Sequence, residues 1–100
     1  MFKVEISEEA LKQFKKLDKQ IAKLIFAWIR KHLVDTTDPR KQGKSLVGDK
    51  KSIWRYRIGD YRLLCNIYDD KLIILVIEVG HRREVYQKWD MSLVHIKNVN

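Results

Sequence analysis

The sequence of 100 residues holds one cysteine, one proline and four glycines. Its single cysteine, Cys65, excludes an internal disulfide and stands within an apolar, strand-like pattern, as is typical of reduced cytoplasmic proteins. The longest uninterrupted aliphatic run, residues 72–77, is too short to cross a bilayer. The first ten residues also lack the basic-then-apolar pattern of a signal peptide. These features predict a cytoplasmic protein that does not enter a membrane.

Motifs for metal and nucleotide chemistry are missing as well. His32, His81 and His95 are scattered along the chain and, with one cysteine, form no metal-ligand spacing. No glycine-rich phosphate loop occurs, and no serine or cysteine stands in a nucleophile motif. The sequence therefore predicts neither a metal nor a cofactor.

Positive charge is what the chain has in abundance. It carries 21 Lys+Arg against 13 Asp+Glu, which gives a net charge of +8. Hydrophobic residues make up 45% of the sequence, so residues 1–100 are expected to form a single small globular domain. So large a charge on a small surface favours a polyanionic partner, such as nucleic acid or an acidic protein. Charges spread evenly for solubility would give the same net charge. The positions of the charges must therefore decide between a polyanionic partner and solubility.

Hydrophobic periodicity predicts helices in the first third of the chain. Residues 2–6 alternate between apolar and polar, which indicates a short strand. Ser7 then suits the N-cap of a helix, because the two glutamates that follow it favour the positive end of the helix dipole. Apolar residues continue at helical spacing as far as Leu33, and Asp18 marks a break between two helices of a hairpin.

The middle of the chain predicts a sheet. Residues 35–52 form a long basic loop, and loops of this length are uncommon in compact domains unless they have a function. Strands are expected at residues 53–58, 61–68 and 71–79, and Gly59-Asp60 fits a two-residue type II′ hairpin turn.

Helical spacing returns after the last strand. The apolar residues that predict a short C-terminal helix are Val85, Trp89, Leu93 and Ile96. The expected fold is α+β: an N-terminal strand and a helical hairpin packed on an antiparallel sheet of about four strands, with a short C-terminal helix.

The hairpin places three arginines on one face of the predicted sheet. With a two-residue loop, Arg57 pairs with Arg62, and Arg55 lies on the same face. The opposite face is apolar and consists of Trp54, Tyr56, Ile58, Tyr61, Leu63 and Cys65. Directly opposed like charges destabilise a strand pair by on the order of 0.2–1 kcal/mol. Three guanidiniums on a rigid face match phosphate oxygens, although arginines that simply fan into solvent are the plainer interpretation.

The last strand ends in the segment His81-Arg82-Arg83-Glu84, followed by Tyr86. Whether these residues reach the three arginines depends on the register of the turn at Asp69-Asp70, which the sequence does not fix. If they do, arginines would stabilise a phosphorane while His or Tyr moves protons. This set suits cleavage of an RNA phosphodiester by its own 2′-hydroxyl.

The segments WRYRIGDYRLL (residues 54–64) and VIEVGHRREVY (residues 76–86) resemble the bacterial RelE/ParE toxin superfamily, and its RelE branch in particular. The resemblance extends over nearly the whole chain. It implies a type II toxin that cuts mRNA in the ribosomal decoding site without a metal. It also implies a cognate RelB-like antitoxin and a toxin–antitoxin complex that binds operator DNA.

The resemblance also implies roles for individual residues. It places Arg55, Arg57 and Arg62 in the basic catalytic sheet. Arg82, or else Arg83, would stabilise the phosphate, and Tyr86 would stack on or protonate the cleaved RNA. Further RNA contacts would come from Lys44, Lys50, Lys51 and Arg83.

One departure from the family concerns the general base. The founding toxin of the RelE branch carries lysines at the positions of Arg55 and Arg57, and one of them is its proposed base. Arginine, with a pKa above about 12, is a poor base near neutral pH. His81 is therefore the candidate base here, and the alternative is a strand-end residue whose ring is bonded to backbone.

The same scaffold also carries ParE-like toxins, which bind and poison DNA gyrase without cutting nucleic acid. ParE-type chains usually lack the full basic and tyrosine set, so its presence here favours RNA cleavage. That set consists of Arg55, Arg57, Arg62, Arg82 and Tyr86. An inert member kept for its antitoxin complex is the third possibility.

Overall fold

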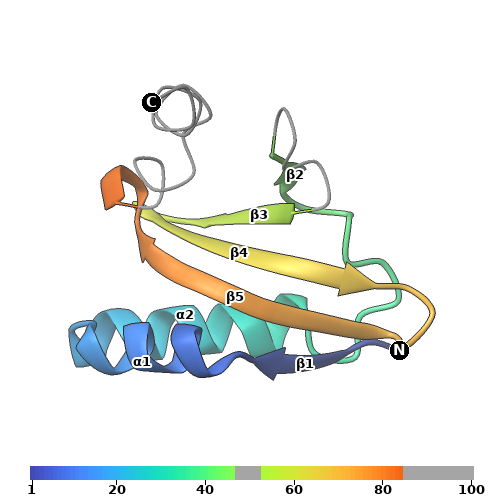
Figure 1. Ribbon diagram of the computed structural model, residues 1–100, viewed down its shortest axis with the longest axis horizontal. Coiled ribbons are helices and arrows are strands. Elements are labelled where there is room, and N and C mark those ends of the chain that lie inside the picture. The colour runs from blue at the N-terminus through green and yellow to red at the C-terminus, as the bar shows by residue number, and fades with distance from the viewer. Residues whose placement is uncertain (47–52, 85–100) are drawn as a thin grey trace, which may run out of the picture.

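A computed structural model describes residues 1–46 and 53–84 of the chain. Its elements are β1 (Lys3–Ile6), α1 (Glu8–Lys16), α2 (Lys19–His32), β2 (Lys44–Ser45), β3 (Ile53–Ile58), β4 (Tyr61–Tyr68) and β5 (Ile73–His81). The two helices lie next to each other beside the sheet (Figure 1). The predicted α+β class is therefore confirmed. None of the helices in these ranges is long and apolar enough to cross a membrane.

Residues at the helix starts explain the helical hairpin. Ser7 caps α1, as predicted, and its side chain accepts a hydrogen bond from the Ala10 amide at 3.1 Å. Asp18, the predicted break, is the N-cap of α2 and accepts a hydrogen bond from the Gln20 amide at 2.8 Å. A short polar residue at each start satisfies amides that the helix leaves unpaired, which fixes where each helix begins.

The sheet has the strand order β1-β5-β4-β3-β2. Strands β3 to β5 pair antiparallel, as predicted, and β2 adds antiparallel to β3, whereas β1 joins the other edge of the sheet parallel to β5. The fifth strand, β2, lies within the predicted loop. Its two residues are both exposed, so no alternation of apolar and polar residues marked it in the sequence.

The β3–β4 hairpin forms as predicted. Its register pairs Ile58 with Tyr61 and Arg57 with Arg62. Gly59 has a φ of 60°, and Asp60 is not among the described residues with positive φ, which fits a type II′ turn. By contrast, β5 begins at Ile73 rather than residue 71, because Leu72 adopts a left-handed φ of 55° within the turn.

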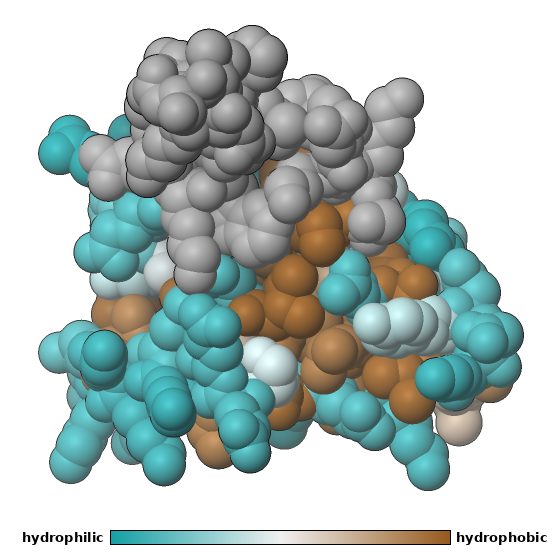
Figure 2. All heavy atoms as spheres, viewed as in Figure 1, coloured by the Kyte–Doolittle hydropathy of each residue, from teal (hydrophilic) through white to brown (hydrophobic). Residues whose placement is uncertain are grey.

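The core lies between the helices and one face of the sheet. Buried side chains from the helices, led by Phe14, Ile25 and Ile29, pack with the predicted apolar face of the hairpin. The fully buried members include Tyr56, Leu63, Cys65, Ile74 and Val76. Figure 2 shows hydrophobic residues in the middle of the visible face, with hydrophilic residues toward its margins.

The predicted C-terminal helix falls mostly outside the described residues. Residues 82–84 are helical, but Val85, Trp89, Leu93 and Ile96 lie outside the described ranges, as do Tyr86, Lys50 and Lys51. The fold thus presents the site through β2 to β5 and the first residues after β5.

Candidate functional site

Four cations share the face of the sheet that is turned away from the helices. Arg57 pairs with Arg62 across the hairpin, and Lys44 of β2 pairs with Arg55 of β3. Paired residues of antiparallel strands point to the same side, and the neighbouring Tyr56 points into the core. We call the face that carries Lys44, Arg55, Arg57 and Arg62 the arginine face. The predicted grouping of the three arginines is confirmed, and β2 adds Lys44 to it.

The two opposed arginines have different environments. Arg57 is exposed, whereas Arg62 is only 2% exposed. Nη1 of Arg62 donates hydrogen bonds to the carbonyl oxygens of Gly59 at 2.8 Å and Tyr61 at 2.9 Å. The Arg62 guanidinium therefore turns back onto its own hairpin and stabilises the turn. Arg57 remains available to a ligand in solution.

A carboxylate that sequence reasoning missed lies on the same face. Glu78 of β5 pairs with Leu64 of β4, and Leu64 pairs with Arg55, so the three residues form one row across the sheet. Glu78 is 6% exposed. A carboxylate on the same face as guanidiniums offsets part of their mutual repulsion. The sequence signal was one acidic residue within an otherwise apolar strand.

A shift in strand register decides the position of Glu78. The β4–β5 pairing changes between Leu64 and Cys65, so Cys65 pairs with Val76 and Ile77 is the extra residue. Ile77 packs against a small second apolar cluster that contains Ile53 and Leu64. The arginine face is therefore apolar at one end and cationic toward the Gly59-Asp60 turn.

His81 does not join the arginine face. It pairs with Tyr61, and the two rings meet edge to face with centroids 5.6 Å apart. Because Tyr61 packs against the core, His81 lies on the helix side of the sheet. Its Nδ1 accepts a hydrogen bond from the Arg83 amide at 3.2 Å, so the neutral ring carries its proton on Nε2. The structure shows the second alternative from the sequence, a ring bonded to backbone, and a base role for His81 stays a prediction.

The cavity next to His81 lies between α1 and the end of β5. Its volume is about 420 Å³, and its polar lining consists of Gln13, Lys16, Asp18, Tyr61, Glu78, His81 and Glu84. Gln13 fixes the helix against the strand, because its Oε1 accepts a hydrogen bond from the Val79 amide at 2.8 Å. Glu78 belongs both to the lining of this cavity and to the row that contains Arg55.

The residues after β5 return toward the hairpin turn. The Arg82 amide donates a hydrogen bond to the Asp60 carbonyl oxygen at 2.8 Å. The side chains of Arg82 and Arg83 are both exposed. This bond holds the backbone of Arg82 at the end of the hairpin where Arg57 and Arg62 lie.

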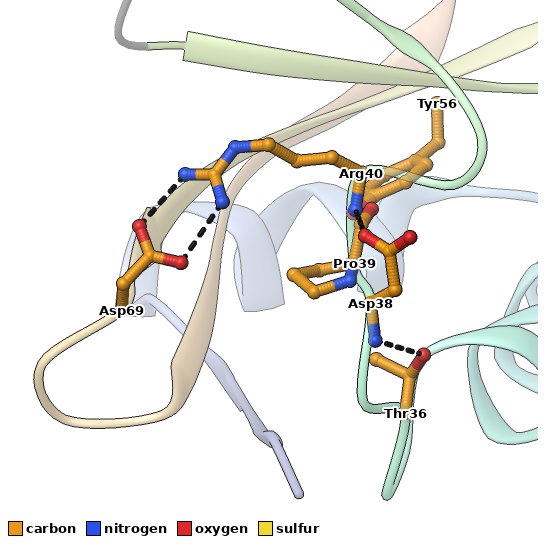
Figure 3. A network of polar contacts seen from close by, with 6 residues as sticks. All are labelled: Thr36, Asp38, Pro39, Arg40, Tyr56 and Asp69. Atoms are coloured by element: carbon orange, nitrogen blue, oxygen red, sulfur yellow. Dashed lines mark hydrogen bonds and ion pairs between the residues drawn. The ribbon is translucent and has the colours of Figure 1, made fainter.

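A network of polar contacts holds the loop that leads into β2 (Figure 3). Arg40 forms a bidentate ion pair with Asp69, with both N–O distances at 2.9 Å. The Tyr56 hydroxyl donates to the Pro39 carbonyl oxygen at 2.6 Å. Burial raises the pKa of this phenol far above its ordinary value, so Tyr56 serves as a hydrogen-bond donor rather than an acid or base. The network positions β2, and with it Lys44, alongside Arg55.

The chemistry available on the arginine face is the binding of anions. Its guanidiniums present N–H donors in planar forks that suit phosphate oxygens. Within residues 1–46 and 53–84, no three His, Cys, Asp or Glu side chains are grouped so that they could hold a metal ion.

Proteins of type II toxin–antitoxin systems match this chain both in sequence and in fold. The sequence model of the ParE toxin of the type II toxin–antitoxin system parDE matches residues 4–86. A chain of the RelBE2 toxin–antitoxin complex from Mycobacterium tuberculosis is 25% identical, with a TM-score of 0.73 over 80% of this chain and 96% of that chain. No curated protein sequence matches.

Two structures of the E. coli toxin RelE are also similar. A mutant with two arginine-to-alanine substitutions, in the free state, is 26% identical, with a TM-score of 0.67 over 86% of this chain and 90% of that chain. The isolated toxin is 24% identical, with a TM-score of 0.66, and the match covers 100% of both chains. These matches extend over most of the fold described above.

Proposed function

Because the chain belongs to the RelE/ParE toxin superfamily of type II toxin–antitoxin systems, we propose that it is an endonuclease that cuts mRNA on the ribosome and so inhibits translation. The observation that supports this activity is the arginine face, where Lys44, Arg55 and Arg57 lie together on a rigid sheet. The planar forks of N–H donors on this face suit the phosphate oxygens of RNA.

The proposed reaction is cleavage by the RNA's own 2′-hydroxyl. The 2′-oxygen attacks the adjacent phosphorus and loses its proton, and the bond to the 5′-oxygen breaks as that oxygen gains a proton. The products are a 2′,3′-cyclic phosphate and a 5′-hydroxyl, and the reaction consumes no metal or cofactor. Arg57 and Arg55 would stabilise the charge that develops on the phosphorane, and Arg82 would join them from the end of the hairpin.

The reaction needs a base for the 2′-hydroxyl proton and an acid for the leaving 5′-oxygen. Among the described residues of the arginine face, Glu78 carries a carboxylate and is therefore a candidate for the general base. Tyr86, Lys50 and Lys51 remain candidates for RNA contact or proton transfer and lie outside the described residues. His81 would need to break its bond to the Arg83 amide and cross to the other face.

An antitoxin is the second proposed partner. The similar chain from M. tuberculosis comes from a toxin–antitoxin complex, which supports a partner of the same kind here. We propose a RelB-like antitoxin whose acidic segment covers the arginine face, and a complex that binds operator DNA. The proposed action on ribosomes implies a location in the cytoplasm.

A ParE-like activity is the second candidate function, because the matching family model is that of a ParE toxin. Such a toxin would bind DNA gyrase and cut no RNA. The two candidates differ in what stops first when the toxin is induced in growing bacteria. We expect incorporation of labelled methionine to fall within minutes while incorporation of labelled thymidine continues. The reverse order would replace the proposed function with the ParE-like one.

A biochemical experiment tests the cleavage itself. Purified toxin is added to ribosomes programmed with a defined mRNA, and the cut sites are mapped by primer extension. We expect cuts within the codon in the decoding site, with 5′-hydroxyl ends, and a loss of about 10²–10³ in rate for Arg57→Ala. Intact mRNA in the presence of ribosome-bound toxin would contradict the proposal.

A further inference from the structure

Two adjoining cavities form a groove along the outer edge of β3. Trp28 of α2 and Arg57 of β3 line both of them. The first cavity, of about 160 Å³, reaches the arginine face at Lys44 and Arg55. The second, of about 410 Å³, extends along α2 to Lys31. We call the two together the edge groove.

The edge groove exists because β2 is short. Lys44 and Ser45 pair with Arg55 and Trp54 of β3. In the described part of the chain, no strand covers the rest of this edge, from Tyr56 to Ile58. Trp28 fills part of the space from the helix side, with its ring 5.4 Å from that of Tyr56. The groove therefore leads from the arginine face around the edge of the sheet to α2.

The charge of the edge groove selects an anionic ligand. Lys31, Lys44, Arg55 and Arg57 line it, and no carboxylate of the described residues does. The smaller cavity holds the volume of about five waters. This is below the roughly 300–1,000 Å³ of sites for drug-sized molecules. Its occupant is therefore one planar group or one small anion, and not a folded peptide segment.

The smaller cavity also carries groups that recognise a planar ring. The carboxamide nitrogen of Gln42 lies 3.0 Å from Nδ1 of His32, whose ring in turn lies 4.7 Å from that of Trp28. The carboxamide oxygen of Gln42 accepts no hydrogen bond within the described ranges and is available to a ligand. Proteins bind unstacked bases by stacking them on aromatic side chains and by forming hydrogen bonds to their edges, and Trp28 and Gln42 offer groups of these two kinds.

The wall of the smaller cavity is rigid. The Gln42 carbonyl oxygen accepts a hydrogen bond from Nε1 of Trp54 at 2.7 Å. Gly43 has a φ of 87°, and a Cβ there would lie 2.4 Å from the Arg55 carbonyl oxygen. Only glycine fits at this position, so the backbone itself forms the wall. A preformed wall of this kind favours binding, because little conformational freedom is lost when the ligand enters.

We propose that the edge groove binds the nucleotide next to the scissile phosphate, with its base against Trp28 and Gln42 and its phosphate on Arg57 and Lys31. This inference rests on the proposed RNA cleavage and adds a base-selecting site to it. Gln42 would favour bases that offer an N–H to its carboxamide oxygen. Lys31 would bind the backbone of any sequence, because a phosphate contact carries no sequence information.

Photo-crosslinking on programmed ribosomes tests where the RNA lies. The mRNA carries 2′-O-methyl groups in the decoding-site codon, which block cleavage, and 4-thiouridine as one or the other of the two nucleotides that adjoin the scissile phosphate. We expect crosslinks to Trp28 or Gln42 from one of the two probes. Toxin that co-sediments with ribosomes but crosslinks only to the arginine face would overturn this inference alone. Toxin that does not co-sediment would overturn the proposed function and this inference with it.

Variants separate selection from general binding. Gln42→Ala should change the relative cleavage of substrates that differ in the flanking base by about 2- to 10-fold. Lys31→Ala should weaken cleavage of all substrates alike and reduce its salt dependence. The control is Lys23→Ala, an exposed lysine of α2 that lines neither cavity.

An unchanged base preference in Gln42→Ala would overturn the inference. So would an edge groove whose amides are protected from hydrogen exchange by an acidic antitoxin but not by mRNA.

Discussion

At the scale of single residues, two arginines of the same strand pair differ in their exposure to solvent. Arg57 and Arg62 face each other across one strand pair, yet only Arg57 is exposed. His81 is the last residue of β5, and its Nδ1 accepts a hydrogen bond from the backbone on the helix side of the sheet. Residue type and position in the sequence therefore do not separate a ligand-binding side chain from one that supports the fold.

The two opposed arginines should respond differently to truncation. Repulsion between opposed like charges, taken alone, would let Arg62→Ala keep the fold intact. The structure reverses this expectation, because truncation leaves the Gly59 and Tyr61 carbonyls without their donor. We expect Arg62→Ala to lose about 1–2 kcal/mol of unfolding free energy. The thermal midpoint should then fall by roughly 4–8 °C per kcal/mol.

Arg57→Ala is the matched control for stability, since Arg57 is exposed on the partner strand. Its thermal midpoint should equal or exceed that of the wild type, while its cleavage of mRNA falls by about 10²–10³. Equal midpoints for the two variants would show that the Arg62 hydrogen bonds contribute nothing to stability.

The structure also changes the expectation for His81. A general base contributes about 10²–10⁴ in rate. The Nδ1 of His81 already accepts a hydrogen bond, and glutamine retains an acceptor for the Arg83 amide. We therefore expect His81→Gln to cleave mRNA within about tenfold of the wild-type rate in single-turnover assays on ribosomes. A loss of 10² or more, with ribosome binding unchanged, would restore the imidazole as the base.

At the scale of elements, turns and loops determine what the strands present. The β3–β4 turn sets the register that groups the arginines, and the loop before β2 brings Lys44 beside Arg55. The turn before β5 lowers the stability of the fold, because Leu72 adopts a φ of 55°. A left-handed conformation is unfavourable for a side chain with a Cβ.

Replacing Leu72 should stabilise the protein. Asparagine tolerates the left-handed region, and Leu72 is 44% exposed, so little apolar burial is lost. We expect Leu72→Asn to raise the unfolding free energy by about 0.5–1 kcal/mol in chemical denaturation. Leu11→Asn is the control, because Leu11 is 43% exposed but lies in α1, where asparagine is a poorer helix former. Equal effects of the two substitutions would contradict the strain at Leu72.

The ion pair between Arg40 and Asp69 predicts a dependence on pH. The hydrogen-bonded Arg40 guanidinium lowers the pKa of Asp69 in the folded state. Its stabilising effect is therefore fully present above the unfolded pKa of about 4 and is lost as the pH falls through the lowered folded value. The thermal midpoints of the wild type and Arg40→Gln should differ slightly at pH 7 and converge in acid. The difference should be small, because both side chains are largely exposed.

At the scale of the whole molecule, the distribution of charge matters more than its total. The net charge is +8, and the described sheet concentrates cations on the face opposite the helices and around the β3 edge. An acidic partner that covers this surface would neutralise the toxin and block its ligand at the same time.

Hydrogen exchange on the free toxin and on its antitoxin complex tests this arrangement. We expect added protection of the amides at residues 55–62, where the arginine face and the hairpin turn lie. The part of the cavity beside His81 that α1 and the residues after it contribute (Gln13, Lys16, Leu17 and Asp18) provides the internal comparison, since none of these residues belongs to the arginine face or the hairpin. Protection confined to these residues would place the antitoxin elsewhere.

The sequence by itself determined the features that depend on neighbours along the chain. Ser7 and Asp18 cap helices because each reaches an amide two or three residues away. Gly59-Asp60 closes a hairpin of fixed register, which alone groups Arg55, Arg57 and Arg62. The tertiary structure decided the rest. Glu78 faces the arginines because of a register shift between β4 and β5, and His81 faces the helices through the same pairing. Lys44 reaches Arg55 only when a loop without periodicity folds back as β2. Pairing between segments distant in sequence depends on how the whole core packs, and no local pattern encodes it.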